Sequence, residues 1–91
     1  MKFIHEKNEI LLLNDEGVAC AGVKFPNVKD GIVNVTTTYV NEEMQGQGIA
    51  GKLMTELVVN LQKTNRRAIP TCTYTRNWFL KHPEYDELIV K

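Results

Sequence analysis

The sequence has 91 residues, 43% hydrophobic and 24% charged, which excludes more than one domain as well as a disordered or low-complexity chain. Eleven Lys and Arg balance eleven Asp and Glu, and this excludes the broad basic field of proteins that bind nucleic acid or anionic membranes. No apolar run approaches the ~20 residues that cross a bilayer, and residues 1–7 do not resemble a secretory signal, so we expect a cytoplasmic protein.

The first forty residues predict a meander of antiparallel strands, because short runs of strand-favouring residues alternate with turn formers. Asp and Gly in residues 14–17, and Asn, Asp and Gly in residues 27–31, favour turns. The expected strands are residues 2–7, 9–14, 18–25 and 32–40. Four strands before any helix indicate an α+β domain.

The second half of the chain predicts one long helix, because leucines and other apolar residues recur at helical spacing from Gly48 to Lys63. Asn65 tolerates the left-handed conformation that ends helices. Residues 68–73 are expected to form a fifth strand, in which Pro70 favours an edge or splayed position because it donates no hydrogen bond. A short helix is expected over residues 77–81.

The most informative segment is the glycine-rich run Gln45–Lys52, where the last of these four strands leads into the long helix. Without side chains, successive backbone N–H groups at a helix N-terminus can point at one anion, and the helix dipole adds to the attraction. A phosphate or pyrophosphate is therefore the expected ligand. The alternative is that Gly46 and Gly48 only make a tight turn.

Two familiar phosphate loops do not fit this segment. Gly46, Gly51 and Lys52 have the spacing of a Walker loop, but Leu53 stands where Ser or Thr must hold Mg²⁺. A dinucleotide-binding fold places its glycines after the first strand of a parallel sheet, whereas four strands come first here. We therefore predict no metal site.

The segment resembles the pyrophosphate loop of the GNAT superfamily of acyl-CoA-dependent N-acyltransferases, which reads Gln/Arg-x-x-Gly-x-Gly/Ala between a fourth strand and a long helix. Residues 45–50 fit every fixed position. Cys72 and the segment His82-Pro83-Glu84-Tyr85 are similar to the C-terminal part of a small subfamily of about 90–100 residues. The resemblance implies a single truncated GNAT-like domain over residues 1–91, with an antiparallel sheet of about five strands, one long helix after the fourth and a short C-terminal helix.

The resemblance also implies a ligand and its binding residues. Acetyl-CoA would be the co-substrate and an unidentified amine, small molecule or protein, the acceptor. The chain would be a monomer or weak homodimer. The fifth strand would splay from the fourth to admit the pantetheine chain. The residues implied in acetyl-CoA binding are Tyr39, Val40, Gln45, Gly46, Gln47, Gly48, Ile49, Ala50 and Gly51.

Cys72 is the first catalytic candidate, because the resemblance places it near the acyl thioester. As a thiolate, with its pKa lowered by Arg76, Lys81 or His82, it could accept the acyl group; the alternative is an inert, buried side chain. His82 is the second candidate, as a general base, against a helix-ending role before Pro83. Cys20 is interpreted as structural, and both thiols as free.

Members of the subfamily often carry a histidine near Thr37, and this chain has none there. Glu42, Glu43 or His82 would then have to supply the base. A second hypothesis is therefore a non-catalytic CoA-binding sensor or adaptor, and a third is an interaction domain that binds no phosphate. Lys52, Lys63, Arg66 and Arg67 are either ligands of the CoA 3′-phosphate or solvated helix-end residues.

Overall fold

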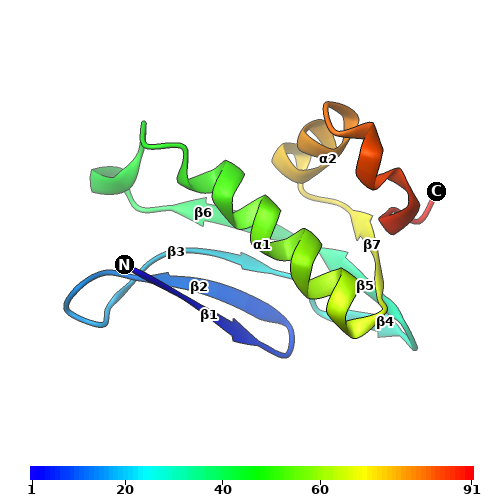
Figure 1. The fold of residues 1–91 in the computed structure, drawn as a ribbon, viewed down its shortest axis with the longest axis horizontal. Coiled ribbons are helices and arrows are strands. Elements are labelled where there is room, and N and C mark those ends of the chain that lie inside the picture. The colour runs from blue at the N-terminus through cyan, green and yellow to red at the C-terminus, as the bar shows by residue number, and fades with distance from the viewer.

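The computed structural model describes residues 1–91 as seven short strands and two α-helices, with the long helix lying across the strands (Figure 1). The strands are β1 (Lys2–Glu6), β2 (Glu9–Leu13), β3 (Ala19–Lys24), β4 (Asn27–Lys29), β5 (Ile32–Val35), β6 (Thr37–Val40) and β7 (Arg67–Pro70). The helices are α1 (Ile49–Thr64), α2 (Thr73–Leu80) and the 3₁₀ segments η1 (Glu42–Met44) and η2 (Pro83–Leu88). The predicted α+β class is confirmed.

The larger sheet has the order β1-β2-β3-β6 and is antiparallel throughout. Its second turn lies where the sequence predicts it: the Asn14 side chain accepts hydrogen bonds from the backbone N–H groups of Glu16 and Val18. Gly17 in this turn has a φ of 79°, which only glycine adopts without strain. The meander of the first forty residues is thus largely as expected.

The smaller sheet, β4-β5-β7, departs from the prediction in three ways. The expected turn 27–31 contains β4, which pairs with β5. The expected strand 32–40 is divided at Thr36, and β7 runs parallel to β5 rather than antiparallel. The parallel pairing has a physical reason, since the helix α1 carries the chain back along the sheet before β7 begins, as in a crossover connection.

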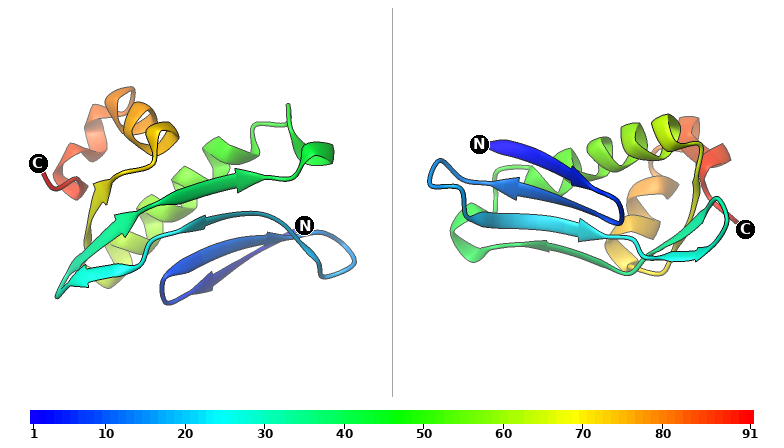
Figure 2. Two further views of the ribbon diagram at one scale, coloured as in Figure 1. Left: turned by 180° about the vertical axis from the view of Figure 1, so that it is seen from behind. Right: turned by 90° about the horizontal axis from the view of Figure 1, so that it is seen from below.

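The division at Thr36 arises because two consecutive residues face one residue of β3. The Thr36 N–H donates to the Lys24 carbonyl at 3.1 Å, while Thr37 is the residue in register with Lys24. Two residues opposite one is the arrangement of a β-bulge, which bends a strand. The bend lets β5 pair with β7 while β6 pairs with β3 (Figure 2).

One core joins both sheets to α1. The helix buries the predicted apolar stripe, including Leu53, Leu57 and Leu61, against strand residues such as Val23 and Val35. The C-terminal segment adds Phe79 of α2 and Leu88 of η2 to this cluster. No helix is both long and apolar enough to cross a membrane.

The end of the chain is more helical than the sequence predicts. α2 starts at Thr73, four residues before the expected start, and η2 occupies part of a tail that had no assignment. The strand expected over residues 68–73 correspondingly ends at Pro70, because the chain turns into α2, whose N-cap is Cys72. Trp78 stacks on His82 and Tyr85, which fixes η2 against α2.

Candidate functional site

The glycine-rich loop leads directly into α1, as the sequence predicts. Gly48 occupies the N-cap position with a φ of 72°, and Gly46 has a φ of 82°. Both lie in the left-handed region that other residues enter at a cost of about 1–2 kcal/mol. No heavy atom lies within 4 Å of the position where a Cβ would stand on either glycine. Backbone conformation, rather than crowding within the chain, therefore requires glycine here.

This loop contains an unbroken series of backbone N–H groups that have no acceptor within the chain. No backbone or side-chain acceptor in the chain bonds the N–H groups of Gly46–Gly51, and no side chain caps the helix. No acidic residue lies in the first turn of α1. Helix N-termini carry partial positive charge and normally receive a capping side chain. An anion with several oxygens is the ligand that six adjacent donors fit.

The outer edge of β6 begins beside this loop. The Asn41 N–H donates to the Cys20 carbonyl, so alternation along the antiparallel pair turns the backbone groups of Thr38 and Val40 away from β3. The Gln45 side-chain amide donates to the Val40 carbonyl at 3.2 Å. Of the two predicted strand residues, Val40 therefore presents backbone groups to the open edge.

Tyr39, the other predicted residue of this strand, packs against the strand beside it. A Cβ on Gly22 would stand 2.9 Å from the Tyr39 ring, so the ring lies directly over that glycine. Burial, and then the negative charge of Glu9, raise the pKa of the Tyr39 hydroxyl. The side chain thus covers the sheet, and its phenol stays protonated at neutral pH.

The predicted splay between the chain segments is present beyond Pro70. β5 and β7 pair up to Val35 and Pro70, and the Cys72 N–H then donates to the Val35 carbonyl at 2.8 Å. Beyond these contacts, β6 continues along β3, whereas the chain after β7 turns into α2. Figures 1 and 2 show β6 and α2 diverging from this point. Cys72 lies at the point of divergence.

Cys72 is the N-cap residue of α2 and is half-buried. Its Sγ lies 3.8 Å from the Thr38 hydroxyl, which lies 3.4 Å from the Thr75 hydroxyl. Burial acts to raise the pKa of the thiol, but hydrogen bonds from the backbone and hydroxyl of Thr75, from Thr38 and from the Tyr74 backbone outweigh it and lower the pKa. The pKa of the thiol is therefore lowered by neutral hydrogen-bond donors. The sequence had suggested Arg76, Lys81 or His82 as the cause, and none of these contributes.

The start of α2 lies next to the start of α1. The Tyr74 hydroxyl is 3.9 Å from the Cβ position of Gly51, and burial raises the pKa of this hydroxyl. Tyr74 therefore links the Cys72 segment to the glycine loop, so the loop, the β6 edge and the thiol border one region.

His82 lies away from this region. Its Nδ1–H donates to the Trp78 carbonyl at 2.7 Å, and its ring stacks on the Trp78 ring. The eight residues of α2 separate it from Cys72 by about 12 Å at 1.5 Å per residue. The structure does not bring the two catalytic candidates together, and the contacts of His82 match its helix-ending role.

The predicted cation cluster is divided between the two ends of α1. Lys52 is exposed in the first turn, whereas Lys63, Arg66 and Arg67 follow at the far end of a 16-residue helix, about 24 Å along its axis. The last three residues therefore lie far from the glycine loop. Cys20, buried with its Sγ–H donating to the Leu12 carbonyl, has the structural role expected of it.

A family model described as GCN5-related N-acetyl-transferase matches residues 9–88, a segment that includes the glycine loop and Cys72. The chain belongs to the GCN5-related N-acetyltransferase (GNAT) family. No curated protein sequence matches it significantly.

Solved structures share the GNAT fold with this chain. An NMR structure of a GCN5-like protein from Staphylococcus aureus is 24% identical, with a TM-score of 0.77 over 98% of this chain and 87% of that one. A GNAT family N-acetyltransferase from Escherichia coli in complex with CoA is 23% identical, with a TM-score of 0.60 over 75% of this chain and 43% of that one. One from Elizabethkingia anophelis with acetyl-CoA bound is 14% identical, with a TM-score of 0.60 over 84% and 51%. The chain thus spans about half the length of the latter two.

The sequence analysis did not identify three residues that lie beside Cys72 or the start of α1. Thr38 follows Thr37, which the sequence analysis names only because no histidine stands near it, and Thr75 and Tyr74 are not among the candidate residues. One local signal was available for Thr75, because the backbone N–H of the third residue after an N-cap commonly donates to the N-cap side chain. Nothing in the sequence pairs Thr38 with Cys72, 34 positions away.

Proposed function

We propose that this GNAT domain binds acetyl-CoA at the glycine loop and transfers its acetyl group to an amine. The observation that carries the proposal is the series of six adjacent N–H donors, from Gly46 to Gly51, that no acceptor in the chain satisfies. A pyrophosphate offers several oxygens to such a series, and its charge complements the helix dipole.

The neighbouring groups fit the rest of the ligand. The pantetheine part of acetyl-CoA contains amides, and the outer edge of β6 presents backbone groups of Thr38 and Val40 that amides can pair with. Gln45 donates to the Val40 carbonyl, so its side chain would have to move for a ligand amide to take that acceptor. The neighbours with CoA and acetyl-CoA bound have the same fold and support this choice of ligand.

Cys72 supplies a route for the acetyl group. Acetyl-CoA carries an activated thioester, and a thiolate at Cys72 would attack its carbonyl carbon, displacing CoA as a thiolate and leaving the acetyl group on Sγ. The acceptor amine would then attack the same carbon, release the Cys72 thiolate and lose one proton. The lowered pKa of the Cys72 thiol favours the first step, because the thiolate is the nucleophile.

The binding step is tested by thermal unfolding with and without acetyl-CoA. Ligand at a hundred times its Kd adds about 2.7 kcal/mol, and each kcal/mol moves a domain of this size by about 4–8 °C, so we expect a rise of at least 10 °C. An unchanged midpoint at millimolar acetyl-CoA would refute the ligand assignment.

The transfer step is tested by intact mass spectrometry. Incubation with acetyl-CoA should add one acetyl group to the protein, Cys72→Ser should remove it, and Cys20→Ala should keep it. A panel of amines should then discharge the acetylated protein and appear as acetylated products. A midpoint rise with neither adduct nor product would instead identify a CoA-binding module without catalysis.

A further inference from the structure

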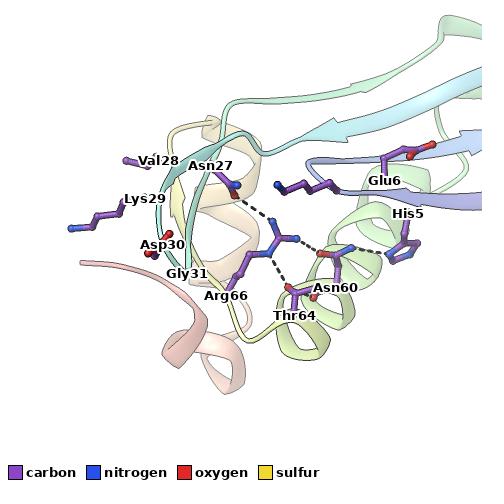
Figure 3. A pocket seen from close by; sticks show the side chains of 11 residues that line it. His5, Glu6, Asn27, Val28, Lys29, Asp30, Gly31, Asn60, Thr64 and Arg66 are labelled. Atoms are coloured by element: carbon purple, nitrogen blue, oxygen red, sulfur yellow. Dashed lines mark hydrogen bonds between the residues drawn. The ribbon is translucent and has the colours of Figure 1, made fainter.

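The largest pocket of the molecule, about 610 Å³, lies at the C-terminal end of α1 and not at the glycine loop. It is formed by the end of β1, the β4 segment with the turn that follows it, and the last turn of α1 (Figure 3). Only one of its 11 lining residues is hydrophobic. Since α1 has 16 residues, about 24 Å separate this pocket from the glycine loop, so it is distinct from the proposed acetyl-CoA site.

Arg66 is the central side chain of this pocket in Figure 3. Its Nε–H donates to the Thr64 hydroxyl and its Nη2–H to the Asn60 side-chain oxygen, both at 2.8 Å. One face of its guanidinium lies 5.5 Å from the centre of the Phe25 ring. These contacts hold the guanidinium in place, and burial lowers the pKa of Arg66, as expected of a partly desolvated cation.

The Asn60 amide is itself fixed in orientation. Asn60 is only 6% exposed, and because its oxygen accepts from Arg66, its Nδ2–H₂ must face His5 Nδ1, 3.0 Å away. His5 Nε2 then lies 2.8 Å from a Glu56 carboxylate oxygen. A chain of hydrogen bonds from β1 through α1 therefore preorganises Arg66.

Although these hydrogen bonds fix its orientation, Arg66 has no acidic partner. The ion pairs of the molecule are Met1–Asp15 and Lys91–Asp86, and Glu56 bonds the His5 imidazole. Neither of the two carboxylates that line the pocket takes part in these contacts. Glu6, one of them, points away from Arg66 in Figure 3. Three cationic and two acidic side chains line the pocket, which leaves one excess positive charge with His5 neutral.

The Nη1 group of Arg66 also lacks a good acceptor. Its contacts with the side-chain oxygens of Asn8 and Asn27 are 3.4 and 3.5 Å long, beyond the ~2.7–3.2 Å of ordinary N–H···O bonds. Nη1 therefore keeps donors that the chain does not fully use, and a guanidinium fork matches two oxygens of one anion.

We propose that this pocket binds a small oxyanion, a carboxylate or a phosphate, on the Nη groups of Arg66. The anion would replace the two long amide contacts, and Asn27 would rotate to donate its amide N–H₂ to it.

Amide and side-chain NMR of the ¹⁵N-labelled chain tests the proposal. The protein is titrated separately with sodium phosphate and sodium acetate, with the ionic strength held constant by sodium chloride. We expect saturable shifts of the Arg66 Nε–H signal and of amides in residues 27–31. The anion with the lower Kd identifies the class. Phosphate binding to the glycine loop would shift Gly46–Gly51 instead, so the two sites are read separately. No saturable shift at Arg66 and residues 27–31 with either anion would overturn the proposal.

Asn27→Asp provides the matched variant, because its carboxylate would stand where Asn27 Oδ1 lies 3.5 Å from Nη1. This internal anion should abolish the anion-dependent shifts and raise the unfolding midpoint at low salt above that of the wild type. Asn77→Asp adds the same charge on the exposed face of α2 and should leave the shifts intact. Shifts that survive in Asn27→Asp would contradict the proposal.

Discussion

The C-terminal end of α1 is capped by backbone hydrogen bonds, whereas no group in the chain caps its N-terminal end. We call these the closed end and the open end. Asn65 is left-handed, with a φ of 55°, and its N–H donates to the Gln62 carbonyl while the Arg66 N–H donates to the Leu61 carbonyl. These two bonds form a Schellman motif, which satisfies the last carbonyls. At the other end, Gly48 provides no capping side chain and six N–H groups have no acceptor.

The two ends show how a helix terminus becomes a binding site. A capping side chain is worth about 0.5–2 kcal/mol of stability, and α1 lacks it at the one end that adjoins the open edge of β6 and the Cys72 thiol. A side-chain cap at Gly48 would compete with a ligand for the same N–H groups. Substitutions at the N-terminal end of α1 are therefore expected to change ligand affinity. Substitutions at its C-terminal end are expected to change only the free energy of unfolding.

Among the substitutions considered, Gly48→Ala is expected to have the largest effect on acetyl-CoA binding. A side chain at a φ of 72° is strained by about 1–2 kcal/mol, which would shift the loop and misalign its donors. The acetyl-CoA-dependent rise in unfolding midpoint should disappear. Gly17→Ala is the matched control, since it imposes the same strain at a φ of 79° in a distant turn; it should lower the midpoint yet preserve the rise. Loss of the rise in both variants would contradict the loop assignment.

The next largest effect is expected for the reactivity of the Cys72 thiol when the Thr38 hydroxyl is removed. Because hydrogen bonds lower the pKa of its thiol, the rate of alkylation by iodoacetamide should rise with pH through a midpoint below the ~8.5 of a free cysteine. Thr38→Val removes one donor and should move this midpoint upward. The measurement uses the Cys20→Ala background, so that one thiol remains. An equal midpoint with and without the Thr38 hydroxyl would show that the hydrogen bond has no influence on the pKa.

Gly51→Ala should separate stability from binding at the open end. The new methyl group would lie 3.9 Å from the Tyr74 hydroxyl, an ordinary contact, and replacing a helical glycine by alanine stabilises by about 0.5–1 kcal/mol. The unliganded midpoint should therefore rise, while the further rise with acetyl-CoA should shrink because a side chain limits close approach to the backbone. Calorimetric titration with acetyl-CoA checks the affinity directly, and unaltered affinity would mean that the ligand does not approach Gly51.

The smallest effect is expected for the free energy of unfolding when Asn65, at the C-terminal end of α1, is replaced. Asn65→Gly relieves a left-handed φ of 55° and should raise the free energy of unfolding by a few tenths of a kcal/mol, or about 1 at most. The acetyl-CoA affinity should stay the same, since α1 separates this residue from the loop. Urea denaturation provides the stability and the same calorimetric titration the affinity. A changed affinity would show that the two ends of α1 are coupled.

Local signals in the sequence were enough to predict α1, its end at Asn65 and the glycine loop. Each of these depends on a spacing or a residue type within one segment. The parallel pairing of β7, the bulge at Thr36 and the hydrogen bonds of Cys72 depend instead on residues far apart in the chain. The same holds for Arg66, for which the sequence suggested CoA binding or solvation, and whose guanidinium lies over Phe25 and donates to Asn60.

The glycine loop is tested most directly by the amide NMR signals of Gly46–Gly51 in the presence of acetyl-CoA and of acetylpantetheine, which lacks the pyrophosphate. Acetyl-CoA should move these six signals, as its oxygens accept from the N–H groups, and acetylpantetheine should leave them in place. Signals that stay unmoved at saturating acetyl-CoA, or that move equally with both compounds, would contradict the assignment of this loop to the pyrophosphate.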